Sequence, residues 1–119
     1  MRKVIPGEQA RSGRALSGAV IANGFVFVSG QTYVQGGDIE AQTRGALDKI
    51  VALLTEAGTD TAHAVRCTVF ISDSNYRDQV NAVYATYFPV DPPARAVIVM
   101  GSGPGSKAFV EIDCTAVLP

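Results

Sequence analysis

An arginine and a glutamate stand in segments that are otherwise almost entirely apolar and strand-like. Arg95 lies in ARAVIVM, residues 94–100, and Glu111 lies in FVEIDC, residues 109–114. Both residue types are seldom buried unless they are paired, because an isolated buried charge is costly and an arginine does not lose its proton. Two such residues in adjacent elements predict a shared polar pocket.

Two interpretations of this pair are open. In the first, Arg95 and Glu111 form a buried ion pair without chemistry, which seldom adds net stability because desolvation offsets the attraction. In the second, Arg95 holds a ligand carboxylate with its planar set of donors, and Glu111 acts on a water or on the ligand. If one strand lies between them, their backbones are about 10 Å apart, which leaves room for a small organic acid of roughly three to five carbons.

The elements that position these residues follow from apolar spacing and turn signals. Asn23-Gly24 between two apolar runs predicts a hairpin, because both residues tolerate positive φ. Asp38 as N-cap and Gly58 as the stop enclose apolar residues at helical spacing, which predicts a helix between them. A second helix is predicted over 75–88, with Tyr84 and Tyr87 on its packing stripe. Strands are predicted at 3–5, 19–22, 25–29, 64–72, 94–100 and 108–117, with a flexible link at 101–107.

The predicted order is β-β-β-α-β-α-β-β. Each helix joins two strands, so right-handed crossovers place both helices on the same face of the sheet. Several strands are nevertheless apolar on both sides, and two helices cover only one face. The bare apolar face predicts a partner surface, for which a second copy of the chain is the simplest candidate.

Length and composition limit the other possibilities. The 119 residues suffice for one domain, 1–119, and 47% hydrophobic against 18% charged residues excludes a disordered chain. The net charge of −1 and the lack of a basic cluster argue against nucleic acid as a partner, and no apolar run is long enough for a membrane span. Without a secretory signal, Cys67 and Cys114 are expected as buried free thiols in a cytoplasmic protein rather than as a disulfide. No cysteine or histidine spacing indicates a metal site.

Six stretches, taken together and in this order, resemble one family. They are FVFVSGQ (25–31), GGDIEAQTRGALDKI (36–50), CTVFISDSNY (67–76), NAVYATYF (81–88), PPARA (92–96) and VEIDC (110–114). The set resembles the RidA family, also called YjgF/YER057c/UK114. The resemblance implies a chorismate-mutase-like α+β fold: a mixed six-stranded sheet with the sixth strand between the third and fourth, the fifth beyond the fourth, and both helices on one face. It also implies a homotrimer with ligand clefts between subunits.

The same resemblance implies an activity and a set of site residues. The activity is hydrolysis of reactive enamines or imines, namely 2-imino acids such as iminopropanoate and iminobutanoate, to 2-keto acids and ammonia, without a cofactor. Arg95 would bind the substrate carboxylate and Glu111 would position the water. The other implied substrate-binding positions are Ser29 and Gly30 through their backbone, Asn75 reaching in from the neighbouring subunit, and Tyr76 beside it.

Two departures from the family pattern concern the substrate. The family's Gly-Pro-Tyr loop is Gly13-Arg14-Ala15 here, so the cleft tyrosine is replaced by Ala15. The family's cysteine two residues after the arginine is Val97, which argues against covalent catalysis and for water activated by Glu111. These departures favour a divergent subgroup, and they keep open a deaminase of another enamine, such as aminomuconate or aminoacrylate. A non-catalytic ligand-binding or chaperone-like role also stays open, whereas the ribonuclease activity described for some members is disfavoured by the charge.

Overall fold

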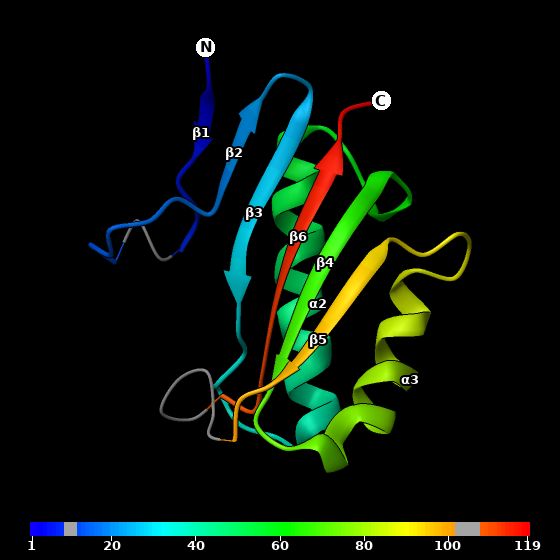
Figure 1. The fold of residues 1–119 in the computed structure, drawn as a ribbon. Helices are drawn as coiled ribbons and strands as arrows, with labels where there is room; N and C mark the ends of the chain where they lie inside the picture. Colours follow the sequence, from blue (N-terminus) through cyan, green and yellow to red (C-terminus); the bar gives the residue numbers. More distant parts are fainter. Residues whose placement is uncertain (9–11, 102–107) are drawn as a thin grey trace.

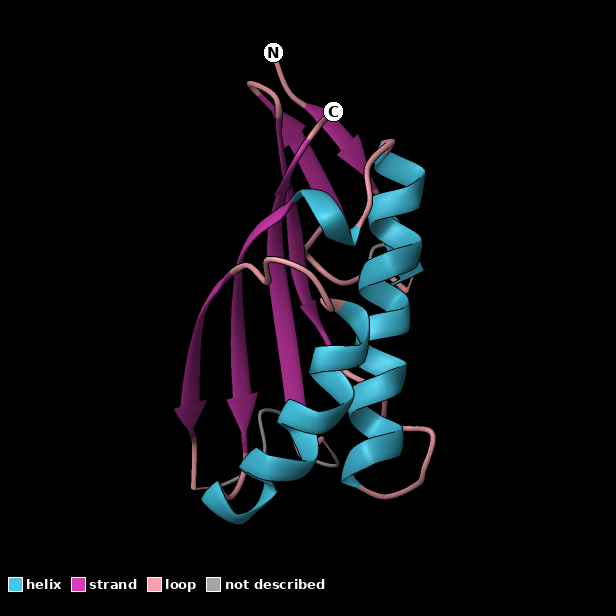
Figure 2. Ribbon diagram, turned by 90° about the vertical axis from the view of Figure 1, so that its right-hand side faces the viewer, coloured by secondary structure: helices cyan, strands magenta, loops and turns pink. Residues whose placement is uncertain are grey.

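The computed structural model describes residues 1–8, 12–101 and 108–119, and shows one sheet with its helices on one side (Figure 1 and Figure 2). The strands are β1 Lys3–Ile5, β2 Ala19–Ala22, β3 Phe25–Gln31, β4 Ala64–Ile71, β5 Ala94–Val99 and β6 Val110–Val117. The helices are α2 Ile39–Ala57 and α3 Arg77–Tyr87, with short 3-10 turns at Thr61–His63 and Ser74–Tyr76. Most of the predicted link at 101–107 lies outside the described residues.

The six strands are arranged in the order β1-β2-β3-β6-β4-β5. β4 and β5 run parallel, and every other neighbouring pair is antiparallel. In Figure 1 the last strand, β6, lies between β3 and β4, as the family resemblance implied. The strand order therefore confirms the predicted mixed sheet and places β4 between the strands that carry Arg95 and Glu111.

The core lies between this sheet and α2. The Asp38 side chain accepts a hydrogen bond from the Ala41 N–H at 2.9 Å, and Gly58 ends the helix in the left-handed region at φ 92°. The apolar stripe of α2 packs on the alternating inward side chains of the central strands. Its fully buried members include Ala46, Leu47, Ile50 and Leu54, which face Val69, Ile71, Val110 and Ile112. Each large aliphatic side chain buried in this way contributes about 1.5–3 kcal/mol.

The hairpin is confirmed, but its second strand is longer than predicted. Asn23 and Gly24 both have positive φ, 52° and 79°, as the turn requires. The predicted end of this strand at residue 29 is wrong, because β3 continues to Gln31 through a β-bulge. The bulge places two residues, Ser29 and Gly30, opposite one residue of β6, which bends the strand without ending its pairing.

The second predicted helix begins differently from the prediction. Its first turn is a 3-10 helix, Ser74–Tyr76, and α3 proper begins at Arg77. The Asp73 side chain accepts a hydrogen bond from the Asn75 N–H at 2.8 Å and so fixes the start of the turn. Strands β4, β5 and β6 are one or two residues shorter than predicted at the ends that meet loops.

Among the residues that the structure describes, no helix lies on one face of the sheet (Figure 2). Large apolar side chains lie exposed there, including Phe25, Phe27 and Ile98, with Phe27 at 47% exposure. A sheet face of this kind usually packs on another surface, so the exposed apolar face agrees with the prediction of a partner surface. No helix in the described part of the chain is long and apolar enough to cross a bilayer.

Candidate active site

Glu111 lies on the uncovered face of the sheet. Along β6, Val110 and Ile112 point to the helices and are fully buried, so alternation turns Glu111 and Asp113 to the other side. Glu111 pairs with Phe70 of β4 and is half-buried. This burial raises the pKa of the Glu111 carboxyl, and the nearby charge of Asp113 raises it further. A carboxyl with a raised pKa is suited to accept a proton and return it.

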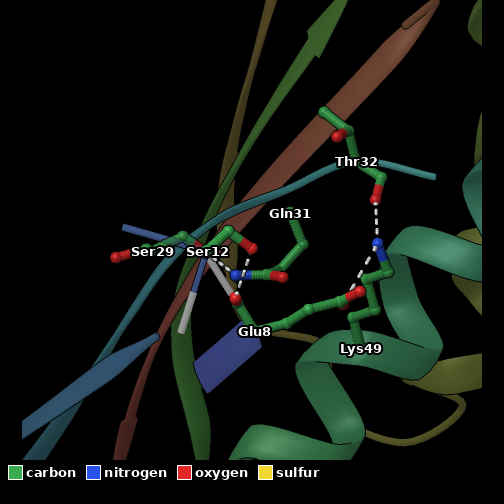
Figure 3. A network of polar contacts seen from close by, with 6 residues as sticks. All are labelled: Glu8, Ser12, Ser29, Gln31, Thr32 and Lys49. Carbon is green, nitrogen blue, oxygen red and sulfur yellow. Dashed lines mark hydrogen bonds and ion pairs between the residues drawn. The ribbon is translucent and has the colours of Figure 1, made fainter. Parts of the chain in front are cut away.

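The carboxylate of Glu111 rests against Gly30 in the β-bulge. A Cβ atom at position 30 would lie 2.6 Å from Glu111 Oε2, so any residue larger than glycine would displace this side chain. Three hydrogen bonds fix the bulge, and Figure 3 shows the last of them. The Ser29 hydroxyl donates to the Ser17 carbonyl at 2.6 Å, the Ser29 N–H donates to the Gly18 carbonyl at 2.9 Å, and Gln31 Nε2 donates to the Ser29 carbonyl at 2.9 Å.

The chain beyond the bulge is tied to α2 in the same network. Lys49 Nζ donates to the Thr32 carbonyl at 2.8 Å and lies 3.9 Å from the Glu8 carboxylate (Figure 3). Gln31 itself is only 2% exposed. The sequence argument gave these residues no role, although a polar residue directly after Ser29-Gly30 in an apolar strand is a signal that the backbone there needs support.

Arg95 lies on the other face, beneath the helices. In the sheet register Arg95 is paired with Cys67, and Cys67 with Cys114, and both cysteines are buried on the helix side. The Arg95 guanidinium stacks over the ring of Tyr84 in α3, with 4.8 Å from its central carbon to the ring centroid. It borders an open hollow of about 280 Å³. The lining residues are Asn81, Tyr84, Ala85, Phe88, Pro92, Pro93 and Arg95.

A single chain therefore does not bring Arg95 and Glu111 into one pocket. They lie on opposite faces of the sheet with β4 between them, because Arg95 shares a register row with Cys67 whereas Glu111 shares one with Phe70. The ion pairs among the described residues are Lys49–Glu8 and His63–Asp60, so the interpretation as a structural Arg95–Glu111 pair does not hold within the chain. A site that uses both residues requires two copies.

Asn75 and Tyr76 lie beyond the end of β4. Asn75 is exposed, and its backbone N–H donates to the Asp73 side chain that caps the turn. Tyr76 packs against Phe109, with 5.8 Å between ring centroids, next to the start of β6. Their contact with a ligand stays a prediction. Ala15 is exposed, and Val97 packs partly buried against the core, so neither offers a group for chemistry.

Two residues that line the Arg95 hollow each have a polar atom without a hydrogen-bond partner within the described part of the chain. These atoms are Asn81 Oδ1 and the Tyr84 hydroxyl, and both are shielded from solvent. Burial raises the pKa of Tyr84, which keeps the hydroxyl protonated. A buried polar atom left unpaired costs about 1–3 kcal/mol, so such atoms often mark a place that a ligand or water completes. Apolar spacing predicts only a packing role for Tyr84 and gives none to Asn81, although a polar residue beside that apolar stripe was the available signal.

The two cysteines lie side by side under the helices as free thiols, as expected. A hydrogen bond between them lowers the pKa of Cys67 and raises that of Cys114. The Tyr84 hydroxyl also lies beside the Cys67 thiol, which is a weak partner and does not give it a hydrogen bond of good geometry.

A mixed six-stranded sheet in this order, with helices on one face only, defines the chorismate-mutase-like class of α+β proteins. The family model described as Endoribonuclease L-PSP matches residues 8–118. A RutC family protein of Synechocystis sp. is 39% identical over 110 residues, covering 85% of this chain and 84% of the relative. The rat 2-iminobutanoate/2-iminopropanoate deaminase is 35% identical over 127 residues, covering 98% of this chain and 90% of the relative.

A solved structure supports the same assignment. The crystal structure of a YjgF/YER057c/UK114 family member from Mycobacterium tuberculosis superposes with a TM-score of 0.89 at 30% identity, covering 99% of this chain and all 100% of the other. The chain belongs to the RidA family, also called YjgF/YER057c/UK114.

Proposed function

We propose that this protein is a hydrolytic deaminase of small 2-imino acids, which it converts to 2-keto acids and ammonia. The observation that carries the proposal is a pair of charged groups without ion-pair partners in the described chain. One is the Arg95 guanidinium over an aromatic ring, and the other is the Glu111 carboxylate seated on Gly30. A cation for the substrate carboxylate and a carboxyl with a raised pKa are what hydrolysis of an imino acid needs. The rat relative is named for this activity.

The proposed site lies between two copies of the chain in a homotrimer. Arg95 lies in the edge strand β5, and Glu111 faces outward from the uncovered side. Packing the exposed face of one copy against the edge of the next would bury Phe27 and Ile98. It would also bring Arg95 of one chain toward Glu111 of its neighbour. The apolar side chains thus provide the association, and the two charged residues provide the site.

The proposed reaction needs one proton-transferring group. The substrate carboxylate binds Arg95, and the imine is protonated, so its carbon is electrophilic. Glu111 takes a proton from a water as the water oxygen bonds to that carbon, which gives a carbinolamine. Glu111 then returns the proton to the nitrogen and the C–N bond breaks to release ammonia. As the carbonyl forms, the hydroxyl gives its proton to Glu111, which is a carboxylate again, and Glu111 passes this proton to solvent. The balance is one water consumed and one ammonia released, and such acid–base help contributes about 10²–10⁴-fold.

A coupled assay tests this proposal. An amino-acid oxidase generates iminopropanoate, and keto-acid release is timed with and without the protein. We expect Arg95→Ala to lower turnover at least about 100-fold through lost substrate positioning, and Glu111→Gln to bind analogues yet turn over slowly. Arg44→Ala removes the same charge from the exposed side of α2 and serves as the matched control. Full activity in Arg95→Ala would refute the proposed role.

A further inference from the structure

The hollow beside Arg95 contains more polar chemistry than a substrate carboxylate would use. Asn81 and Tyr84 are three residues apart on α3, so their side chains lie on neighbouring parts of the same helix face. Both residues line the hollow, and each has one buried polar atom without a hydrogen-bond partner among the described residues. Tyr84 is only 5% exposed. A carboxylate bound to Arg95 does not explain why two residues that line this hollow keep unsatisfied polar atoms.

The chemistry of an occupant follows from these groups. Asn81 Oδ1 accepts a hydrogen bond and so needs a donor, whereas the Tyr84 hydroxyl can donate one. The guanidinium of Arg95 is close to the Tyr84 ring and disfavours a second cation in the same space. Phe88, Pro92 and Pro93 supply apolar walls. A neutral amide fits all of these conditions, because its N–H group donates to Asn81 and its carbonyl accepts from Tyr84.

We propose that Asn81 and Tyr84 are specificity-determining residues that select 2-imino acids with a neutral amide side chain over aliphatic or anionic ones of the same shape. This inference rests on the proposed deaminase function for its biological meaning. The selection itself is a property of binding, so it is measurable whether or not turnover occurs. The volume of about 280 Å³ is ample for a side chain of this size.

Binding of three nearly isosteric acids tests the selection. Succinamate carries an amide, 4-methylpentanoate replaces it with two methyl groups, and succinate replaces it with a carboxylate. By calorimetry on the full chain we expect succinamate to bind about 10-fold more tightly than either of the others, since a site built to hydrogen-bond rejects analogues that leave its groups unpaired. Equal binding of the three, or a preference for succinate, would overturn the inference.

Variants show whether the two side chains are responsible. Asn81→Leu removes the acceptor at similar size and should abolish the preference while 4-methylpentanoate binding is kept. Tyr84→Phe keeps the ring under Arg95 and should weaken the binding of succinamate but not that of the other two acids. Gln79→Leu makes the same exchange at an exposed position of α3 and serves as the control. If Asn81→Leu does not fold, Asn81→Ala takes its place, and a preference that survives in either variant overturns the inference.

Turnover separates this inference from the function on which it rests. Imines of asparagine, leucine and aspartate are generated with a broad-specificity oxidase, and the wild-type protein should favour the asparagine imine. If no imine is hydrolysed yet succinamate is preferred in binding, the deaminase proposal fails and the amide site stands. If all three imines are hydrolysed equally, the deaminase proposal stands and the selection by Asn81 and Tyr84 fails.

Discussion

Glu111 and Arg95 are held by different kinds of contact, with backbone around Glu111 and helix side chains around Arg95. Glu111 rests on backbone: a glycine without room for a Cβ, in a bulge that hydrogen bonds from Ser29 and Gln31 hold in place. Arg95 rests on side chains of a helix, above the Tyr84 ring and beside an open hollow. The first arrangement fixes one group tightly, whereas the second can change with single substitutions in α3. If both residues act as proposed, the sheet holds the proton-transferring group and the helix sets the ligand preference.

Mixing two inactive variants gives the largest expected effect. If Arg95 and Glu111 of different chains form each site, Arg95→Ala and Glu111→Gln chains that are unfolded together and refolded should regain activity. In a cyclic trimer mixed at random, about a quarter of the sites pair an intact Arg95 with an intact Glu111. Keto-acid release from the refolded mixture, compared with each variant refolded alone, is the measurement.

The control for this mixture is a double variant that carries both changes in one chain. Refolded at random with an equal amount of the wild type, it should leave about a quarter of the sites intact, whereas about half would stay intact if each site came from one chain. Absence of any recovery in the mixture of single variants would show that both residues of a site come from the same chain, contrary to their placement on opposite faces.

Gly30→Ala should produce an intermediate effect on the Glu111 side alone. Gly30 does not have positive φ, so the backbone accepts alanine and the penalty comes from the contact with the Glu111 carboxylate. We expect kcat to fall about 10- to 100-fold as the base is displaced, with analogue binding at the Arg95 hollow unchanged. Steady-state kinetics measures kcat, and calorimetry on the same preparation measures analogue binding. In a chain that already carries Glu111→Ala, Gly30→Ala should hardly lower the free energy of unfolding any further. The new Cβ then has no Glu111 carboxylate to clash with.

Glu111→Gln should produce the smallest effect, a rise in thermal stability that depends on pH. Burial raises the pKa of Glu111 in the folded state, so the fold favours the protonated carboxyl. At a pH below the unfolded value of about 4.3 the wild type and the variant should melt alike. As the pH rises through the folded pKa, the wild type bears the cost of a partly buried carboxylate and the variant does not. Melting temperatures of the wild type and the variant at pH 4 and pH 7.5 measure this effect. An equal difference between the two proteins at both pH values would contradict a raised pKa of Glu111.

Local sequence signals predicted most of the fold. Asn23-Gly24, Asp38 and Gly58 act through their own backbone conformations or caps, so neighbouring residues suffice to identify them. The strand order came from family resemblance rather than from periodicity. The bulge after Val28 was missed because a bulge depends on the partner strand, and Gly30 alone looks like a strand end.

The site was predicted only in part, for a related reason. Alternation within β5 and within β6 indicates which residues share a face of each strand, but not which face of the sheet that is. The relation between Arg95 and Glu111 is fixed by the register of both strands with β4, which no local pattern contains. Asn81 was missed because its importance lies in an unpaired oxygen, and hydrogen-bond partners are visible only once the helix is packed.

The paired cysteines under the helices have a practical consequence for measuring motion. Cys67 and Cys114 are 0% and 2% exposed, so a thiol reagent reaches them only when the layer above the sheet lifts or the chain unfolds. Their labelling rate under native conditions therefore reports how often that layer opens. Because Cys67 lies in the same register row as Arg95, slower labelling in the presence of a bound acid would show that ligands hold the two layers together.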